Sequence, residues 1–450
     1  MSKKSSVDLT QGNITKNIIV FSTPIFIGTL FQNLYNSVDA IVVGQYVGRT
    51  SLAAVTSCSD ISMLLTGFFT GLATGAGVLF SRYFGSGDEK NLHIAIHTTL
   101  LFSLILGILM SGLGIVLAPL ILKISACPVD VMPEAITYLK IYLIGILFTS
   151  LYNVGSGVLR AVGDSKNPFY YLVTASVVNI ILDMVFVVLL KMGTMGVALA
   201  TICSQLLSVV LVVAKMYRTE DVYKLVVKDL SIDKPTLAEV VRLGIPSAVQ
   251  ASLISISNLF VQRYINGFGS AAMAGIGSAK KIDKFVGMIA QSIGLAMATF
   301  VSQNIGAGKT ERAFKGIRIS LLFSIGVSIA IGIPIFIFAD FFVGLFTKDD
   351  PEALFYGVQM IRTILPFYVF QAMNQIYSNS VRGFGKSFVV MVLSLLGMIV
   401  CRQIYLAIAM SIYRTTVHIS IGYPLGWFCA GIFVYIYYVF KIKRPYFKEK

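Results

Sequence analysis

Long apolar stretches separated by short polar connections run through the whole chain. Twelve of them are about 20 residues long, the length that a helix needs to cross about 30 Å of hydrocarbon. They cover residues 17–41, 53–78, 95–120, 136–158, 168–190, 196–215, 244–265, 273–299, 318–339, 353–378, 387–411 and 420–440. The pattern predicts an all-α polytopic membrane protein with twelve transmembrane helices.

Composition and charge support this class. The chain has 450 residues, of which 56% are hydrophobic and only 13% are charged, too few for the surface of a water-soluble protein of this size. The net charge of +15 does not indicate nucleic-acid binding, because most lysines and arginines lie in the two tails and in alternate connections. Basic residues favour the cytoplasmic side of short loops, so we expect a plasma-membrane protein with both termini cytoplasmic.

The two halves of the chain resemble each other. Residues 48–54, 81–87 and 160–165 match residues 269–275, 302–308 and 382–387 at an almost constant separation. Each half contains six predicted spans, so the repeats enter the membrane in the same direction and a pseudo-two-fold axis should lie along the membrane normal. We expect an N-terminal six-helix bundle at 1–215, a cytoplasmic linker at 216–242 and a C-terminal six-helix bundle at 243–450.

An acidic residue, Asp39, lies inside the first apolar span. A charge near the bilayer centre costs about 3 kcal/mol on insertion scales, so such residues usually face a cavity and mark an ion or substrate path. Gln32, Asn36 and Asp39 share one helical stripe. A position at the headgroup boundary, or a protonated acid that only holds helices together, is the structural alternative. The repeat counterpart of Asp39 is Phe260, so this acid belongs to the N-terminal half alone.

A second acid, Asp183, lies in the fifth span on a stripe with Asn179. Thr201 and Gln205 form a stripe in the sixth span, and Tyr138 lies one turn from a second tyrosine in the fourth. Two carboxylates with hydroxyl and amide oxygens suit Na⁺, or protons retained by desolvation and like charge. Asp39 and Asp183 are therefore expected to act together, although an independent structural role for one of them stays open.

The C-terminal half offers mostly neutral polar groups. Its seventh span carries Asn258 and Gln262, and its tenth span carries Gln371 and Asn374, which suit either a substrate path or interhelical hydrogen bonds. For Arg402 in the eleventh span there are three alternatives. It is expected to pair with an acid, to line the cavity, or to snorkel to the membrane boundary. The expected substrate-cavity residues are Gln32, Asn36, Gln205, Asn258, Gln262, Gln371, Asn374 and Arg402.

Several short motifs resemble known functional or structural signatures. The string 306–310, GAGKT, imitates a phosphate-binding loop, but Gln303 stands where the first glycine is required, so a tight turn is expected and no ATPase subunit is implied. His93 and His97 have metal-pair spacing but no evident third ligand. Thr236 and Glu239 have the spacing of a capping box at a helix start. No cofactor is expected.

The chain resembles the multidrug and toxic compound extrusion (MATE) family over essentially its whole length. The resemblance is carried by LTQGNI, by NLYNSVDAIVVGQYVG after Pro24, by the twin FGSG and IGAG loops, by RAVGDSKNP with its partner RGFGKS, and by NIILDM. It is closest to the DinF-type branch, because the acids lie in the N-terminal half. The resemblance implies a cation-coupled site of Asp39, Asp183, Asn179, Thr201 and Tyr138, and it implies a bend of the first helix at Pro24. If the ion is Na⁺, Asp39, Asn179, Asp183 and Thr201 are its expected ligands.

These observations predict a transporter and not an enzyme. We expect a monomeric antiporter, coupled to H⁺ or Na⁺, that exports amphipathic and often cationic drugs or toxins by alternating access. The alternative is a lipid-linked-oligosaccharide flippase of the same wider superfamily, for which Lys280, Lys281, Arg263 and Arg402 supply basic groups for a diphosphate. A channel is disfavoured, because no repeated filter loop or ring of charges is present.

Overall fold

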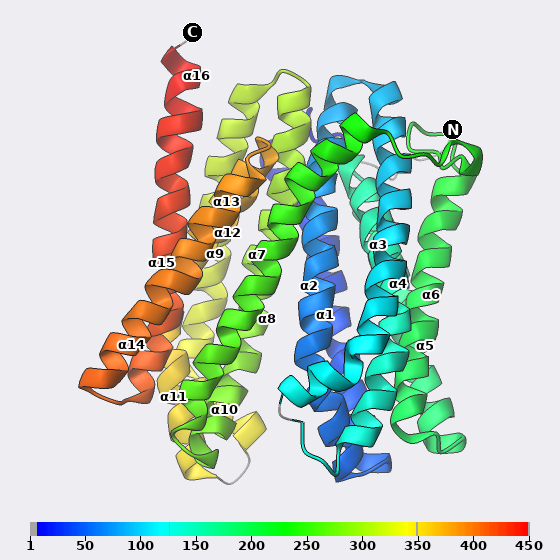
Figure 1. The fold of residues 1–450 in the computed structure, drawn as a ribbon. Helices are drawn as coiled ribbons and strands as arrows, with labels where there is room; N and C mark the ends of the chain where they lie inside the picture. Colours follow the sequence, from blue (N-terminus) through cyan, green and yellow to red (C-terminus); the bar gives the residue numbers. More distant parts are fainter. Residues whose placement is uncertain (1–6, 126, 348–349, 449–450) are drawn as a thin grey trace. The chain divides into compact units, whose positions relative to one another are not determined.

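The computed structural model describes residues 7–125, 127–347 and 350–448, except for the side chains of 36, 40 and 49. Within these ranges every secondary-structure element is helical (Figure 1). Twelve helices there are long and apolar enough to cross a membrane, which confirms the predicted all-α class and the number of spans. Most helices are longer than the predicted apolar spans, because their polar ends continue as helix.

The first six spans lie between Ile14 and Arg218. They are α1 (Ile14–Tyr46), α2 (Arg49–Ser86), α3 (Glu89–Ile124), α4 (Met132–Ala161), α5 (Lys166–Asp183) and α6 (Gly193–Arg218). Helix α5 continues directly into a π-helical segment, Met184–Leu189, which completes its span. A short 3₁₀ turn, Val227–Asp229, lies in the linker that follows α6.

The other six spans lie between Lys234 and Lys448. They comprise α7 (Lys234–Asn266), α8 (Ser270–Gly306), α9 (Thr310–Ile337), α11 with α12 (Pro351–Ile364 and Tyr368–Gly383), α13 with α14 (Ser387–Leu395 and Arg402–Ile412) and α15 with α16 (Thr416–Tyr437 and Arg444–Lys448). A 3₁₀ turn, Leu365–Phe367, joins α11 to α12, and π-helical segments at Leu396–Cys401 and Tyr438–Lys443 join the other two pairs. Sequence reasoning missed the nine-residue α10 (Ala339–Thr347).

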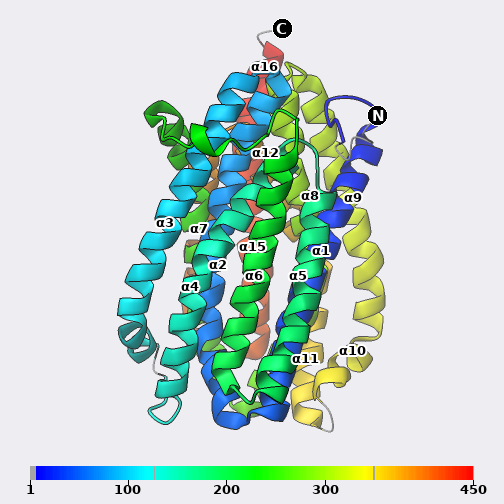
Figure 2. The ribbon, with the colours of Figure 1, turned by 90° about the vertical axis from the view of Figure 1, so that its right-hand side faces the viewer.

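The chain forms two compact units. Unit 1 comprises Met1–Asp8 and Ile27–Ser252, and unit 2 comprises Leu9–Phe26 and Leu253–Lys450. Their limits differ from the domain limits predicted at 215 and 243, because α1 and α7 each contribute to both units. In unit 1, α4 packs against α2, α3 and α6, and Figures 1 and 2 both place α3 beside α4. In unit 2, α8 packs against α9, α11 and α12.

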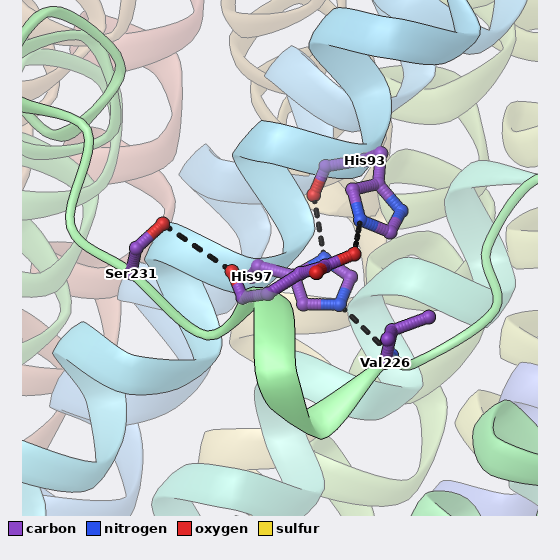
Figure 3. A network of polar contacts seen from close by, with 5 residues as sticks. His93, His97, Val226 and Ser231 are labelled. Atoms are coloured by element: carbon purple, nitrogen blue, oxygen red, sulfur yellow. Dashed lines mark hydrogen bonds and ion pairs between the residues drawn. The ribbon is translucent and has the colours of Figure 1, made fainter.

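The linker after α6 is fastened to α3 (Figure 3). Nε2 of His97 accepts the Val226 N–H at 3.0 Å, and Nδ1 of His97 lies 2.7 Å from the carbonyl oxygen of His93. Nε2 of His93 lies 3.0 Å from Oδ2 of Asp229. The Thr98 hydroxyl donates to the Ser231 carbonyl. Since both ring nitrogens of His97 face backbone groups, this histidine anchors the linker.

The predicted capping box at Thr236 is wrong by one turn. Helix α7 starts at Lys234, and the carboxylate of Asp233 accepts the Thr236 N–H at 2.9 Å. The side-chain and backbone hydrogen bonds of Thr236 hold the pKa of Asp233 below its ordinary value. Glu239 instead accepts from the Tyr83 hydroxyl at 3.3 Å. An aspartate before the first turn satisfies the free N–H groups as well as a threonine does.

The repeated FGSG and IGAG loops form the expected tight turns. Gly87 and Gly308 both adopt a left-handed backbone, with φ of 72° and 71°. Glycine reaches this region without the strain that a Cβ imposes. The next helix follows at once in each case, and Asp88 caps α3 by accepting the Asn91 N–H.

Two glycines one turn apart, Gly71 and Gly75, let α2 and α7 touch through their backbones within unit 1. A Cβ on Gly75 would lie 2.2 Å from the Leu243 carbonyl oxygen, and one on Gly71 would lie 2.5 Å from that of Ser247. In a bilayer the hydrophobic effect does not drive helices together, so their association depends on close van der Waals packing. Small residues at this spacing allow that packing. These glycines therefore fix the first part of α7 against α2.

Replacing Gly75 with alanine should destabilise the protein by about 1–3 kcal/mol, because the added methyl group forces two backbones apart. Thermal unfolding in detergent measures the effect. Gly77→Ala is the matched control on the same helix, since its Cβ would meet nothing closer than 3.9 Å. Equal melting temperatures for the two variants would contradict the close approach.

Candidate functional site

The two buried acids of the N-terminal half meet in unit 1. Asp39 lies on α1 and Asp183 is the last residue of α5, and their side chains are 8% and 0% exposed. Their carboxyl groups lie close enough to interact electrostatically. The structure thus brings together two acids that lie far apart in the sequence.

This contact constrains the charge of the pair. Oδ1 of Asp39 and both carboxyl oxygens of Asp183 are buried and receive no hydrogen bond from an N–H or O–H group among the described residues. An ionised carboxylate only accepts, so two carboxyl groups can be hydrogen-bonded to each other only when one of them carries a proton. Two bare carboxylates at this distance repel each other. Chemically, such a pair can share one proton or bind another cation.

Asn179 lies one turn before Asp183 on α5 and is fully buried. Neither its Nδ2 nor its Oδ1 has a hydrogen-bond partner within the described part of the chain. A buried amide without partners costs about 1–3 kcal/mol. Such a group is expected where a transported ion or a water molecule completes its hydrogen bonds. Its oxygen is of the type that Na⁺ prefers.

Thr201 lies on α6, which packs against α5, and is 5% exposed. Its hydroxyl donates to the Val197 carbonyl at 3.0 Å, so the lone pairs of its oxygen face away from that bond. No group of three or more His, Cys, Asp or Glu side chains in the described ranges could hold a metal ion. A Na⁺ ion in this unit would therefore depend on two carboxylates and on neutral oxygens such as those of Asn179 and Thr201.

Aromatic side chains lie beside the pair. Tyr138 on α4 is 7% exposed and interacts electrostatically with Asp39. Its ring stacks on that of Tyr142, with ring centres 6.2 Å apart, and the Tyr142 hydroxyl lies 3.2 Å from Oγ1 of Thr66. Sequence reasoning missed Tyr35, which also interacts with Asp39. Its position one helical turn before Asp39 was the available signal.

The remaining candidate residues of the N-terminal half are Gln32, Gln205 and Asn36, and the structure describes the side chains of the first two. Gln32 is half-buried and lies about one turn before Tyr35 on α1. Gln205 is half-buried and packs against Gly145 of α4, and its Oε1 has no partner among the described groups. The side chain of Asn36 lies outside what the structure describes.

Helix α1 runs through Pro24 without a break in its assignment. The chain passes from unit 2 to unit 1 just after this residue, between Phe26 and Ile27. Proline removes one helical hydrogen bond and clashes with the preceding turn, so this is a weak point of the helix. The bend expected at Pro24 stays a prediction.

Five predicted cavity residues lie in unit 2, and the four other than Arg402 form the following contacts there. Asn258 accepts a hydrogen bond from Arg402 at 3.0 Å, and Gln262 accepts one from Lys280 at 2.8 Å. Gln371 packs against Gly287 of α8. Asn374 accepts from the hydroxyl of the residue one turn later, Ser378. The contacts of Asn258, Gln262 and Gln371 join different helices and favour the interhelical role that sequence reasoning left open, whereas the Asn374 contact lies within α12.

Two expectations for Arg402 are wrong. Its side chain is only 1% exposed, so it does not snorkel to a boundary. Its guanidinium donates to Ser257 and Asn258, which are neutral, and no acid pairs with it in the described ranges. Of the other basic candidates, Lys281 and Arg263 are exposed.

Comparison with known proteins agrees with this architecture. The MatE family model matches residues 24–185 and 246–408. The probable multidrug resistance protein YpnP of Bacillus subtilis is 30% identical over 435 residues, which cover 96% of this chain and 96% of that protein. The probable multidrug resistance protein YoeA of the same organism is 28% identical over 447 residues, covering 97% and 96%.

Solved structures show the same fold. One, described as the outward-facing conformation of a multidrug resistance MATE family transporter of the MOP superfamily, has a TM-score of 0.91 at 23% identity and covers 98% of this chain and 99% of that one. A crystal structure of MATE in the bent conformation has a TM-score of 0.91 at 24% identity, covering 98% of each chain. Together with the family match and the twelve spans, these findings confirm the resemblance seen in the sequence: the chain belongs to the MatE family and is a multi-pass membrane transporter.

Proposed function

We propose that this chain is a cation-coupled antiporter that exports amphipathic, often cationic, organic compounds across the plasma membrane. The contact between Asp39 and Asp183 carries the proposal, because two buried carboxyl groups in apolar helices hold a cation in one state and release it in another. The names of the Bacillus subtilis relatives, which are probable multidrug resistance proteins, support the substrate class.

In this proposal, binding of the cation is coupled to transport because the protonated and unprotonated acid pairs favour different conformations of α1. With a proton between them, Asp39 and Asp183 hold α1 against α5 by a hydrogen bond. Without it, their repulsion favours a different position of α1, and Pro24 supplies the weak point at which the helix can yield. A cationic substrate and the coupling cation then shift one conformational equilibrium in opposite directions, which is alternating access with antiport. We favour a proton over Na⁺ in this proposal, because a proton would let the two carboxyl groups hydrogen-bond to each other.

The flippase alternative receives less support. Of the four basic residues that could bind a lipid diphosphate, Lys280 and Arg402 both lie over the ring of Tyr423. Lys281 lies instead over Phe346, and Arg263 is exposed. A transporter that acts as a monomer, with both termini cytoplasmic and no ATPase subunit, remains our working arrangement.

Changing both acids to amides, Asp39→Asn with Asp183→Asn, should abolish coupled export, because no ion can then be bound and released. Proteoliposomes with an imposed pH gradient, loaded with ethidium as a fluorescent organic cation, measure it. We expect the rate to fall at least tenfold. Asp130→Asn, an exposed loop acid of unit 1, is the matched control. Full transport by the double variant would refute the mechanism.

Proton release on substrate binding tests whether the coupling ion is H⁺. Ethidium added to the purified protein in weakly buffered detergent should displace protons, which a pH-sensitive dye records. The double variant should release none, because its amides bind no exchangeable proton. A response that requires Na⁺ and releases no protons would instead assign Na⁺ to the pair.

Asn179→Leu separates stability from transport. Removing a buried amide that lacks partners should leave the melting temperature in detergent unchanged or raise it, because about 1–3 kcal/mol of desolvation cost disappears. Ethidium export should nevertheless fall severalfold, because the oxygen that completes the ion site is lost. Unimpaired export by a stable variant would make Asn179 a packing residue.

A further inference from the structure

Unit 2 contains a buried cation that the ion switch does not use. Arg402 is 1% exposed, and its guanidinium donates to the Ser257 hydroxyl at 2.6 Å and to Oδ1 of Asn258 at 3.0 Å. Its Nε has no hydrogen-bond partner among the described groups. A guanidinium has five N–H donors, so neutral oxygens satisfy only part of this one. A charge buried in this way costs several kcal/mol unless an opposite charge joins it.

A second cation faces the same aromatic ring. The Arg402 guanidinium lies 5.7 Å from the centre of the Tyr423 ring, and Nζ of Lys280 lies 5.9 Å from it. Asp283 interacts electrostatically with Lys280 and Tyr423, but its carboxylate already accepts a hydrogen bond from Tyr368. Two cations and one acid leave one positive charge in this group. We call Ser257, Asn258, Lys280, Arg402 and Tyr423 the cationic cluster.

A π-helical segment lies in the fifth span of each half, although the two segments are not at positions that the repeat matches. In the fifth span of the N-terminal half, a π-helical segment, Met184–Leu189, directly follows Asp183. In the fifth span of the C-terminal half, a π-helical segment, Leu396–Cys401, directly precedes Arg402. Such insertions are rare and frequently occur at functional sites. An acid thus adjoins the π-helical segment of one half, and a base adjoins that of the other.

We propose that the cationic cluster binds the carboxylate of an amphipathic organic acid with an aromatic body. The planar guanidinium offers parallel N–H groups to a carboxylate, and one excess positive charge matches a monoanion. Lys280 and Tyr423 are half-buried, so the cluster extends from buried Arg402 to more accessible groups. Tyr423 and Trp427, whose ring stacks on Tyr368 with ring centres 5.5 Å apart, provide aromatic surface for the rest of the ligand.

The chain supplies its own reporter, because Trp427 is its single tryptophan. Its neighbour Gly426 packs against the Arg402 side chain, with the Cδ of Arg402 3.7 Å from the Cβ position of the glycine. Ligands that enter the cationic cluster should therefore change the fluorescence of Trp427. This readout needs no ion gradient, so it is independent of the proposed antiport, and either proposal can fail alone.

The test titrates the purified full-length protein in lipid nanodiscs with three probes of equal size. These are 4-phenylbutyrate, 4-phenylbutylammonium and neutral 4-phenylbutanamide. We expect a saturable fluorescence change with the carboxylate alone, and at least tenfold weaker binding to Arg402→Gln. Arg402→Lys keeps the charge without the planar donors and should bind with intermediate affinity. Arg362→Gln, which removes an exposed arginine paired with Asp340, is the matched control and should bind like the unchanged protein.

Two results would overturn the proposal. One is equal response to all three probes, which indicates partition into lipid or apolar surface. The other is carboxylate binding that Arg402→Gln leaves intact. If Arg402→Gln does not fold, Lys280→Met decides instead: weaker carboxylate binding supports the cluster, and unchanged binding rejects it. No saturable binding of the carboxylate to the unchanged protein also rejects the proposal and leaves Arg402 a structural role.

Discussion

Charge buried in apolar helices is the constraint on which this structure depends. Water does not solvate a carboxylate or a guanidinium there, so each must find a proton, a partner or a ligand. Asp39 and Asp183 lie close to each other, and our proposal lets them meet this requirement by sharing a cation. Arg402 meets it only in part, through neutral oxygens. The groups that cost the most to bury are thus the ones that we propose a transported species acts on.

The sequence repeat explains how one fold carries two chemistries. Both halves share the loops, the glycine turns and a π-helical insertion in their fifth spans. Their charges differ, since Asp183 adjoins the insertion in one half and Arg402 adjoins it in the other. Shared backbone features conserve the helix packing, whereas single side chains set the sign of the charge. A duplicated bundle can in this way acquire complementary binding preferences without a change of architecture.

The helical class and the number of spans could be predicted from the sequence, because hydrocarbon thickness sets a minimum apolar length that is visible in the pattern. The sequence also predicted that Asp39 and Asp183 are both acids on polar stripes of apolar helices. Their contact was not visible in the pattern, since it depends on how α1 and α5 pack. The burial of Arg402 could not be predicted from periodicity either. The sequence pattern of an apolar span is the same whether its arginine is buried or snorkels to the boundary. Short α10 is below the length at which a span pattern is recognisable.

The division of α1 and α7 between the two compact units determines where this chain can act as a hinge. The long linker between the halves lies wholly in unit 1, where His97 and Thr98 fasten it to α3. The chain changes unit between Asp8 and Leu9, inside α1 and inside α7, and both of these helices contain a proline, Pro24 or Pro246. The linker therefore connects no unit to the other. The connections between the units are the segment before α1 and the backbones of two proline-containing helices.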